Sequence, residues 1–311
     1  MMKQLKGRSL LTLNDYTREE IDYLVDLAIE LKKKPAATQR LAGKNIVLIF
    51  DKPSTRTRCA TEVAAYKEGA NITYLTNSQM GGKESVEDTA KVLGRYYDAI
   101  VYRGSSQERA EQLAHYSRLP LYNALTDEDH PTQVLADLMT IKEYLKEPFE
   151  ELKMVYVGDG RNNVANALHI GATKMGISFV ITAPKELINP DSPWEEDPNQ
   201  AVKGANIIYT DVWFSMGEEG KMEERLNLLK PYQVNMELIK AANNENLIFL
   251  HCLPAFHDLE TKVGREVYEK FGLKSMEVSD EVFRSDYSVV FDQAENRMHT
   301  IRALLVATLG D

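Results

Sequence analysis

Cysteine is scarce in this sequence. Only Cys59 and Cys252 occur in 311 residues. Two thiols cannot build a disulfide framework for a chain of this length, so a reducing compartment is the simpler inference. We therefore expect a cytoplasmic protein whose two thiols are free for packing or chemistry. For Cys252, which follows an apolar run, burial as a small hydrophobic side chain is more common than nucleophilic catalysis.

The sequence also lacks long apolar runs and an excess of basic residues. No stretch approaches the roughly 20 apolar residues of a membrane span, and the N-terminus has no long apolar core typical of a secretory signal. Lys and Arg number 37 against 47 Asp and Glu, a net charge of -10. We expect neither a membrane protein nor a general nucleic-acid binder, because phosphate backbones are bound mainly by clustered Lys and Arg. A small anion can still bind where a few basic groups converge.

Short apolar runs alternate with helical patterns along the whole chain. At about 150 residues per domain, the length allows two domains. Alternating strands and helices indicate an α/β fold, in which each domain is a parallel doubly wound sheet flanked by helices. The expected strands are residues 45–50, 72–75, 99–102, 119–122, 154–157, 179–182, 207–210, 247–250 and 289–291.

Three local signals set the expected boundaries. Thr17 and Glu20 have the spacing of a capping box ahead of an apolar helical face. Lys146-Glu147-Pro148 follows a helical pattern over residues 134–145 and is the best interior breaker. We therefore place one domain at residues 1–146 and the other at 147–294. The last helix, residues 295–309, is predicted to pack back on the first domain, which then includes residues 295–311.

Polar segments follow six of the expected strands. In open parallel sheets, ligands bind in the crevice beyond the carboxyl ends of the strands. These segments are therefore expected to bring functional groups to one crevice. They are residues 51–58, 103–104, 123–133, 158–163, 211–217 and 251–254.

The Ser-Thr-Arg-Thr segment at residues 54–57 is the most informative of the six. It follows a strand and precedes a helical pattern, so backbone N–H groups, three hydroxyls and the Arg56 guanidinium can form a phosphate cradle. No P-loop lysine pattern is present, so a nucleoside triphosphate is not implied. Alternatively, Ser54 only caps the helix and the arginines are solvated. Arg56 and Arg58 together, beside Pro53, favour the cradle.

Four motifs in order resemble those of the carbamoyltransferase family. Residues 54–58 match its carbamoyl phosphate motif, and His-Pro-Thr-Gln at 130–133 matches its second motif. Asp-Val-Trp-Phe-Ser-Met-Gly at 211–217 and His-Cys-Leu-Pro at 251–254 are similar to the pair typical of the ornithine branch. The likeness extends from the first helix to the C-terminal helix. One such motif alone would be weak evidence, whereas four in order are strong.

The resemblance implies an enzyme of arginine metabolism that transfers the carbamoyl group from carbamoyl phosphate to L-ornithine, giving L-citrulline and phosphate, with no metal or cofactor. The implied carbamoyl phosphate contacts are Ser54, Thr55, Arg56, Thr57, Gln79, Arg103, His130, Gln133, Cys252, Leu253 and Arg297. The implied ornithine contacts are Asn163, Asp211, Ser215 and Met216. In the family pattern Gln79 reaches the phosphate of a neighbouring subunit, which implies a homotrimer, or a multiple of one, with shared active sites.

Five of these residues are expected to act on the reacting atoms: Arg56, Arg103, His130, Asp211 and Cys252. Positive charge at Arg103 would stabilise the departing phosphate. The side-chain amine of ornithine must lose a proton before it attacks, and Asp211 with Cys252 is expected to orient it. His130 beside Pro131 would, without the resemblance, as readily close a turn.

Two other classes of function remain open at this point. Gly-Asp-Gly at residues 158–160 follows a strand like a dinucleotide fingerprint, but Asn163 stands at the third glycine position, which disfavours an NAD-dependent oxidoreductase. A catalytically dead binding protein on the same fold is the other alternative, and the intact polar groups of every motif argue against it. The remaining histidines have no metal-ligand spacing with the cysteines and are expected to be structural or surface groups. They are His115, His169, His257 and His299.

Within the family, Ser-Met-Gly and His-Cys-Leu-Pro favour ornithine over aspartate or putrescine as acceptor. One departure lies between Pro184 and Asp211, where members of the family usually have a further helix and strand. The Pro-rich segment 189–194 is expected to form no regular structure. Either the second domain is shortened here or residues are missing from the sequence. The physiological direction, biosynthetic or catabolic, is left open.

Overall fold

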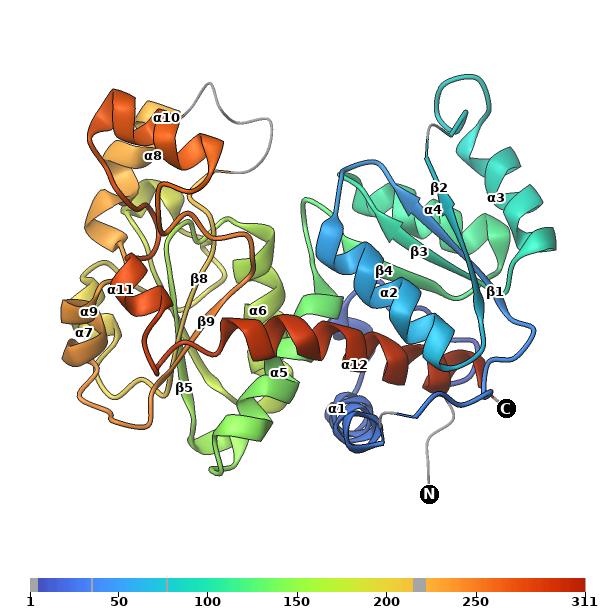
Figure 1. The fold of residues 1–311 in the computed structure, drawn as a ribbon, viewed down its shortest axis with the longest axis horizontal. Coiled ribbons are helices and arrows are strands. Elements are labelled where there is room, and N and C mark those ends of the chain that lie inside the picture. The colour runs from blue at the N-terminus through green and yellow to red at the C-terminus, as the bar shows by residue number, and fades with distance from the viewer. Residues whose placement is uncertain (1–4, 35, 77, 215–221, 311) are drawn as a thin grey trace. The chain divides into compact units, whose positions relative to one another are not determined.

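The computed structural model describes residues 5–34, 36–76, 78–214 and 222–310. The chain divides into two compact units: residues 1–142 with 293–311 form unit 1, and residues 143–292 form unit 2. Each unit contains one parallel sheet with helices packed around it (Figure 1). The predicted α/β class, with two parallel doubly wound sheets, is confirmed.

Unit 1 is built on a four-stranded parallel sheet in the order β2-β1-β3-β4. The strands are β1 (Asn45–Phe50), β2 (Asn71–Leu75), β3 (Ala99–Arg103) and β4 (Leu121–Leu125). The helices that lie wholly or mostly in it are α1 (Arg18–Lys33), α2 (Thr55–Lys67), α3 (Val86–Tyr96), α4 (Gln107–Ser117), α5 (Pro131–Tyr144) and α12 (Val290–Leu309). Apolar side chains of β1, β3, α3 and α4 share one hydrophobic cluster, so α3 and α4 cover one face of the sheet.

Helix α1 starts where the sequence predicts. Thr17 accepts a hydrogen bond from the Glu20 amide, and the Glu20 carboxylate accepts one from the Thr17 amide. This reciprocal capping box satisfies two amides that have no partner inside the helix. The predicted apolar face of α1 is buried, as the spacing of its hydrophobic residues requires.

Helix α12 returns to unit 1. The side chain of Arg302, fully buried, forms an ion pair with Glu68 at the end of α2 and donates to the Leu31 carbonyl of α1. Thr308 shares a hydrogen bond with Tyr122 of β4. The prediction that the C-terminal helix packs back on the first domain is therefore confirmed.

Two expected strands need correction. Residues 289–291 do not form a strand, because α12 already begins at Val290; a short apolar run does not by itself distinguish strand from helix. The strand expected at residues 119–122 is β4, which begins at Leu121 and runs to Leu125. Asn123 therefore lies inside a buried strand rather than after it, and its side chain donates to the Leu11 carbonyl.

Unit 2 is built on a five-stranded parallel sheet in the order β7-β6-β5-β8-β9. Its strands are β5 (Lys153–Val157), β6 (Ser178–Thr182), β7 (Trp194–Glu195), β8 (Ile207–Thr210) and β9 (Ile248–His251). Its helices are α6 (Asn163–Met175), α7 (Pro198–Ala201), α8 (Met222–Leu229), α9 (Met236–Ala241), α10 (Lys262–Phe271) and α11 (Asp280–Phe283). The main core lies between the sheet and three helices, α7, α9 and α11.

The segment after Pro184 is more regular than its proline content predicts. A short strand, β7, pairs with β6, and a single helical turn, α7, follows before β8. The expectation that residues 189–194 form no regular structure holds for 189–193 and is wrong at Trp194, where β7 begins. Pro193 cannot donate to a ladder, but its carbonyl accepts a hydrogen bond from the Ile181 amide, which suits an edge strand. The second domain thus has a reduced strand-helix unit at this edge.

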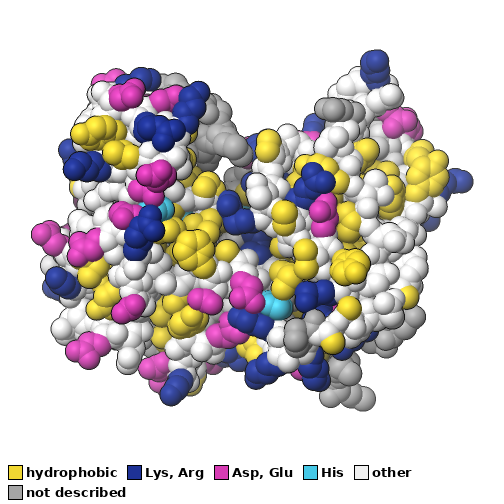
Figure 2. Space-filling model, viewed as in Figure 1, with side chains coloured by type: hydrophobic (Ala, Val, Ile, Leu, Met, Phe, Trp, Pro, Cys, Tyr) yellow, Lys and Arg dark blue, Asp and Glu magenta, His cyan; other side chains and the backbone are white. Residues whose placement is uncertain are grey.

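Two surface features bear on the excluded classes of function. Among the described residues, no helix is long and apolar enough to cross a membrane. On the face of unit 2 shown in Figure 2, acidic and basic side chains are interspersed rather than gathered into one basic surface.

Candidate active site

The first part of the candidate site is the start of α2, directly after β1. Ser54 precedes the helix in extended conformation, and its side chain makes no capping hydrogen bond. The reading of Ser54 as a plain helix cap is therefore not supported. Thr57 in the first turn is buried, whereas Arg56 is exposed. The N-terminus of α2 thus presents backbone N–H groups, hydroxyls and one guanidinium together, a suitable arrangement for an anion.

Arg56 and Arg58 differ in what they contact. Arg58 donates to Glu62 at 2.8 Å one turn further along α2, and its guanidinium lies 3.9 Å from the ring centroid of Tyr74. Arg56 instead acts electrostatically on His130, which precedes α5. The two arginines of the motif therefore differ: Arg58 is held along the helix surface by Glu62 and Tyr74, and the charge of Arg56 lowers the pKa of His130.

The pKa of buried His130 is lowered by its surroundings. Burial lowers the pKa of its imidazole well below the usual 6.5, and positive charge at Arg297, Arg103 and Arg56 lowers it further. The ring is therefore neutral at physiological pH. Its Nδ1 atom is buried and has no hydrogen-bond partner among the described residues. A neutral, buried imidazole in the field of three cations is suited to contact a polar group of a bound anion.

Arg297 reaches this cluster from α12. It donates to the side chain of Gln133 at 2.5 Å and to the Thr57 hydroxyl at 3.0 Å. Gln133 in turn donates to Asp137, which also accepts from Gln293. The return of the C-terminal helix thus connects three predicted site residues from α2, α5 and α12 in one buried network. Arg103, the last residue of β3, contributes its charge to the same histidine.

Gln79, another predicted residue of unit 1, makes no hydrogen bond to this cluster among the described residues. Gln79 is exposed and lies in the loop between β2 and α3. The backbone carbonyl of Gln79 accepts hydrogen bonds from the amides of Gly82, Lys83 and Glu84. The loop is therefore held by its own backbone while the side chain is open to solvent.

In unit 2, Asp211 follows β8 and is buried. Burial raises the pKa of its carboxyl from 3.8 to about 6, while nearby His251, the Val212 amide and Asn162 partly oppose the rise. Asn162 donates to the Asp211 carboxylate at 3.2 Å and also caps α6. The predicted ornithine contact was the next residue, Asn163, which begins α6 and is half-buried. In the loop after β5, the residue that contacts Asp211 is therefore Asn162, which was not among the predicted site residues.

His251 and Glu277 form a pair that sequence reasoning missed. Both side chains are fully buried, with His251 Nε2 at 3.2 Å from a Glu277 oxygen. His251 Nδ1 lies 2.8 Å from the Cys252 carbonyl. Both ring nitrogens of His251 therefore lie within hydrogen-bond distance of an oxygen, which fixes the orientation of the ring. Glu277 belongs to no motif and lies far along the chain, and no pattern could have identified it.

The other predicted residues of unit 2 have different outcomes. Cys252 directly follows β9, is partly buried and is not part of a disulfide; Leu253 comes next in the chain. Ser215 and Met216 lie outside the described residues, so their predicted contact with ornithine stays a prediction. Asp159, in the loop after β5, forms an ion pair with Arg225 of α8, and both side chains are nearly buried. The acidic residue of the Gly-Asp-Gly segment is thus engaged with an arginine.

Each half of the chain matches one domain of a known protein family. Residues 8–143 match the family model of the aspartate/ornithine carbamoyltransferase carbamoyl-P binding domain, and residues 150–308 match that of the Asp/Orn binding domain. The chain is 54% identical over 332 residues to ornithine carbamoyltransferase of Staphylococcus aureus (strain Newman), with all of both chains covered. It is 53% identical to "Ornithine carbamoyltransferase 1, catabolic" of Staphylococcus epidermidis, again over all of both chains.

Solved structures give the same result. The ornithine carbamoyltransferase structure from Pyrococcus furiosus superimposes with a TM-score of 0.89 at 40% identity, covering 99% of each chain. The alignment with the S. aureus relative extends over 332 residues, more than the 311 of this chain. The relative therefore contains residues that this chain lacks, in agreement with the shortness noted in the sequence.

Proposed function

Since this chain belongs to the aspartate/ornithine carbamoyltransferase family and transfers the carbamoyl group of carbamoyl phosphate to ornithine, we propose which of its residues perform the reaction. Unit 1 binds carbamoyl phosphate and unit 2 binds ornithine. The buried network that joins Arg297 to Gln133 and to Thr57, in the first turn of α2, carries the first assignment. The domain boundaries, with residues 1–146 and 295–311 in the carbamoyl phosphate domain and 147–294 in the ornithine domain, stay a prediction.

The phosphate of carbamoyl phosphate is held at the start of α2. Ser54, Thr55 and Thr57 offer hydroxyls and backbone N–H groups, and Arg56 adds a full positive charge. Arg103 offers a second cation at the end of β3. When the bond between carbamoyl carbon and phosphate oxygen breaks, negative charge grows on the leaving phosphate, and these cations stabilise it.

The carbamoyl group lies beside His130, Gln133 and Arg297. Its carbonyl oxygen gains negative charge as the amine attacks, so donors aimed at that oxygen accelerate the step. Arg297 is already oriented by Gln133 and Thr57. A neutral His130 can offer one ring N–H without adding a fourth cation. Cys252 and Leu253 complete the contacts to this group from unit 2.

Ornithine is bound in unit 2, with Asn163, Asp211, Ser215 and Met216 around its α-amino and α-carboxylate groups. Its side-chain amine attacks the carbamoyl carbon only after losing a proton. Asp211 and Cys252 orient that amine, and the raised carboxyl pKa of Asp211, about 6, suits a group that exchanges protons near neutral pH. The products are L-citrulline and phosphate.

The acceptor specificity is tested by citrulline formation with a panel of amines. We expect turnover with L-ornithine and little or none with putrescine, aspartate or N-acetylornithine. Putrescine lacks the α-carboxylate, aspartate lacks a side-chain amine, and N-acetylornithine lacks a free α-amine. Equal turnover of putrescine and ornithine would contradict the assignment of an α-carboxylate site in unit 2. The same assay run without added metal tests the expectation that no metal or cofactor takes part.

Three further properties belong to this proposal. A homotrimer, or a multiple of it, with Gln79 reaching the phosphate of a neighbouring subunit is supported by the exposure of Gln79 and by the family pattern. Sedimentation as a single chain would contradict it. The cytoplasmic location stays a prediction from the two cysteines. A similar protein named as catabolic supports a catabolic role without deciding against a biosynthetic one.

A further inference from the structure

The loop that follows Cys252 is fastened to the rest of unit 2 at successive points. The ring of His251 meets the Cys252 carbonyl, and the Phe256 amide donates to Glu277 at 2.5 Å. The Phe256 carbonyl accepts from the Met276 amide at 2.8 Å. The backbone on both sides of Cys252 and Leu253 is therefore set by contacts with the segment leading to α11.

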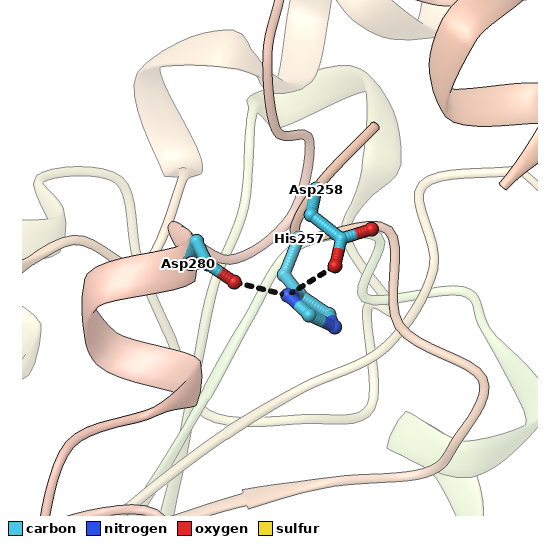
Figure 3. Close-up of side chains that lie close together, drawn as sticks. All are labelled: His257, Asp258 and Asp280. Carbon is cyan, nitrogen blue, oxygen red and sulfur yellow. Dashed lines mark hydrogen bonds and ion pairs between the residues drawn. The ribbon is translucent and has the colours of Figure 1, made fainter. Parts of the chain in front are cut away.

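His257 makes the last of these contacts. Its Nδ1 atom lies 2.6 Å from an Asp280 oxygen at the start of α11 and 3.5 Å from Asp258 (Figure 3). The imidazole stacks on Phe283 of α11 with ring centroids 3.7 Å apart and planes 8° from parallel. The ring is thus fixed in both direction and plane by one short helix.

A metal ion is the obvious alternative occupant of this cluster, because His257, Asp258 and Asp280 bring their ligand atoms within 4.8 Å of one another. Arg284 already pairs with both carboxylates, at 2.8 Å from Asp280 and 3.3 Å from Asp258. A cation entering the cluster would have to displace this guanidinium. The contacts therefore favour a structural connection between loop and helix over a metal site.

We propose that His257 is a positioning residue of the reaction: its hydrogen bond to Asp280 sets the loop that places Cys252 and Leu253 against the carbamoyl group. This inference rests on the proposed contacts of Cys252 and Leu253. A catalytic contact misplaced by about 1 Å can cost orders of magnitude in rate. In this proposal the phosphate is bound by residues at the start of α2 and by Arg103, so loss of the His257 bond is expected to lower kcat and to leave the Kd for carbamoyl phosphate unchanged.

Two substitutions separate the hydrogen bond from the ring. His257→Phe keeps an aromatic ring for stacking on Phe283 and removes the donor. His257→Asn loses the ring and places an N–H near the former Nδ1 position, from which it can still donate to Asp280. His115→Asn, at an exposed histidine of α4, is the matched control. For each variant we would measure kcat, the KM for both substrates, the Kd for carbamoyl phosphate and the melting temperature.

We expect kcat to fall about tenfold in His257→Phe and to recover to within about threefold of wild type in His257→Asn, with the Kd for carbamoyl phosphate unchanged in both. The reverse order, with His257→Phe active and His257→Asn impaired, would overturn the proposal. So would a lower melting temperature with wild-type kcat in both, which marks a merely structural residue.

A Cys252→Ala variant distinguishes this proposal from the one on which it rests. Wild-type kcat in Cys252→Ala rejects the proposed contact between Cys252 and the carbamoyl group. A low kcat in Cys252→Ala together with wild-type kcat in His257→Phe rejects only the positioning role of His257.

Discussion

Replacing Asp211 by Asn removes a buried carboxylate that lowers the stability of unit 2. Burial is the largest cause of its raised pKa, from 3.8 to about 6. A rise of this size corresponds to about 3 kcal/mol of unfavourable free energy for the ionised group, at 1.36 kcal/mol per pKa unit. Asn keeps one oxygen for the Val212 amide, but its NH₂ group faces the Asn162 donor, which costs about 1 kcal/mol. We expect a net gain of about 2 kcal/mol at pH 8.

The pH dependence follows from the direction of the pKa shift. Below pH 3.8 the carboxyl is protonated in both the folded and the unfolded chain, so its ionisation has no effect on stability. Between 3.8 and about 6 the unfolded chain ionises first, and stability falls as the pH rises. Above pH 6 the full loss is present. The stability of Asp211→Asn relative to wild type therefore increases by about 3 kcal/mol from pH 3 to pH 8.

Urea unfolding of both proteins across this pH range measures that difference, since groups that do not interact with Asp211 contribute equally to both chains. Turnover of ornithine by Asp211→Asn at pH 8 should be at least about 100-fold lower, because the amide cannot accept the proton or orient the amine in the same way. A difference in unfolding free energy that does not vary between pH 3 and pH 8 would refute the reasoning.

Two further predictions concern buried partners of the site residues. Arg297→Met keeps apolar bulk but loses the hydrogen bonds to Gln133 and Thr57, so carbamoyl phosphate binding should weaken at least tenfold. The pKa of His130, measured by NMR, should rise toward 6.5, because one of the three cations that lower it is gone. An unchanged His130 titration would contradict this electrostatic account. Glu277→Gln removes a negative charge that raises the Asp211 pKa, so the stability change attributed to Asp211 should move to lower pH in the same urea series. A shift to higher pH would contradict it.

Local patterns predicted local structure well. The Thr17 and Glu20 spacing placed the start of α1, because a capping box depends only on neighbouring residues. The run at residues 289–291 was misread as a strand, because its apolar character reflects burial and does not specify the period. The proline-rich segment before β7 hid an edge strand, because pairing there needs only two residues and the Pro193 carbonyl.

The site residues in motifs that follow strands could be predicted from the sequence. The contacts among them could not, because they depend on the tertiary structure. The position of Arg297 was supplied by family resemblance; its contacts with Gln133 and Thr57 depend on the return of α12, which local sequence does not encode. The choice between Asn162 and Asn163 at Asp211 depends on how α6 begins. Glu277 could not be identified, since its importance arises from burial beside His251.

The central claim is that the start of α2 binds the phosphate of carbamoyl phosphate through Arg56. The most direct measurement is the Kd for carbamoyl phosphate in Arg56→Ala, with Arg58→Ala as the matched control, because Arg58 on the same helix is engaged by Glu62 and Tyr74. Loss of a charge-assisted contact of about 1.5 to 3 kcal/mol predicts affinity weakened about 10- to 150-fold in Arg56→Ala and changed less than about threefold in Arg58→Ala. Unchanged affinity in Arg56→Ala, or an equal loss in both variants, would contradict the account.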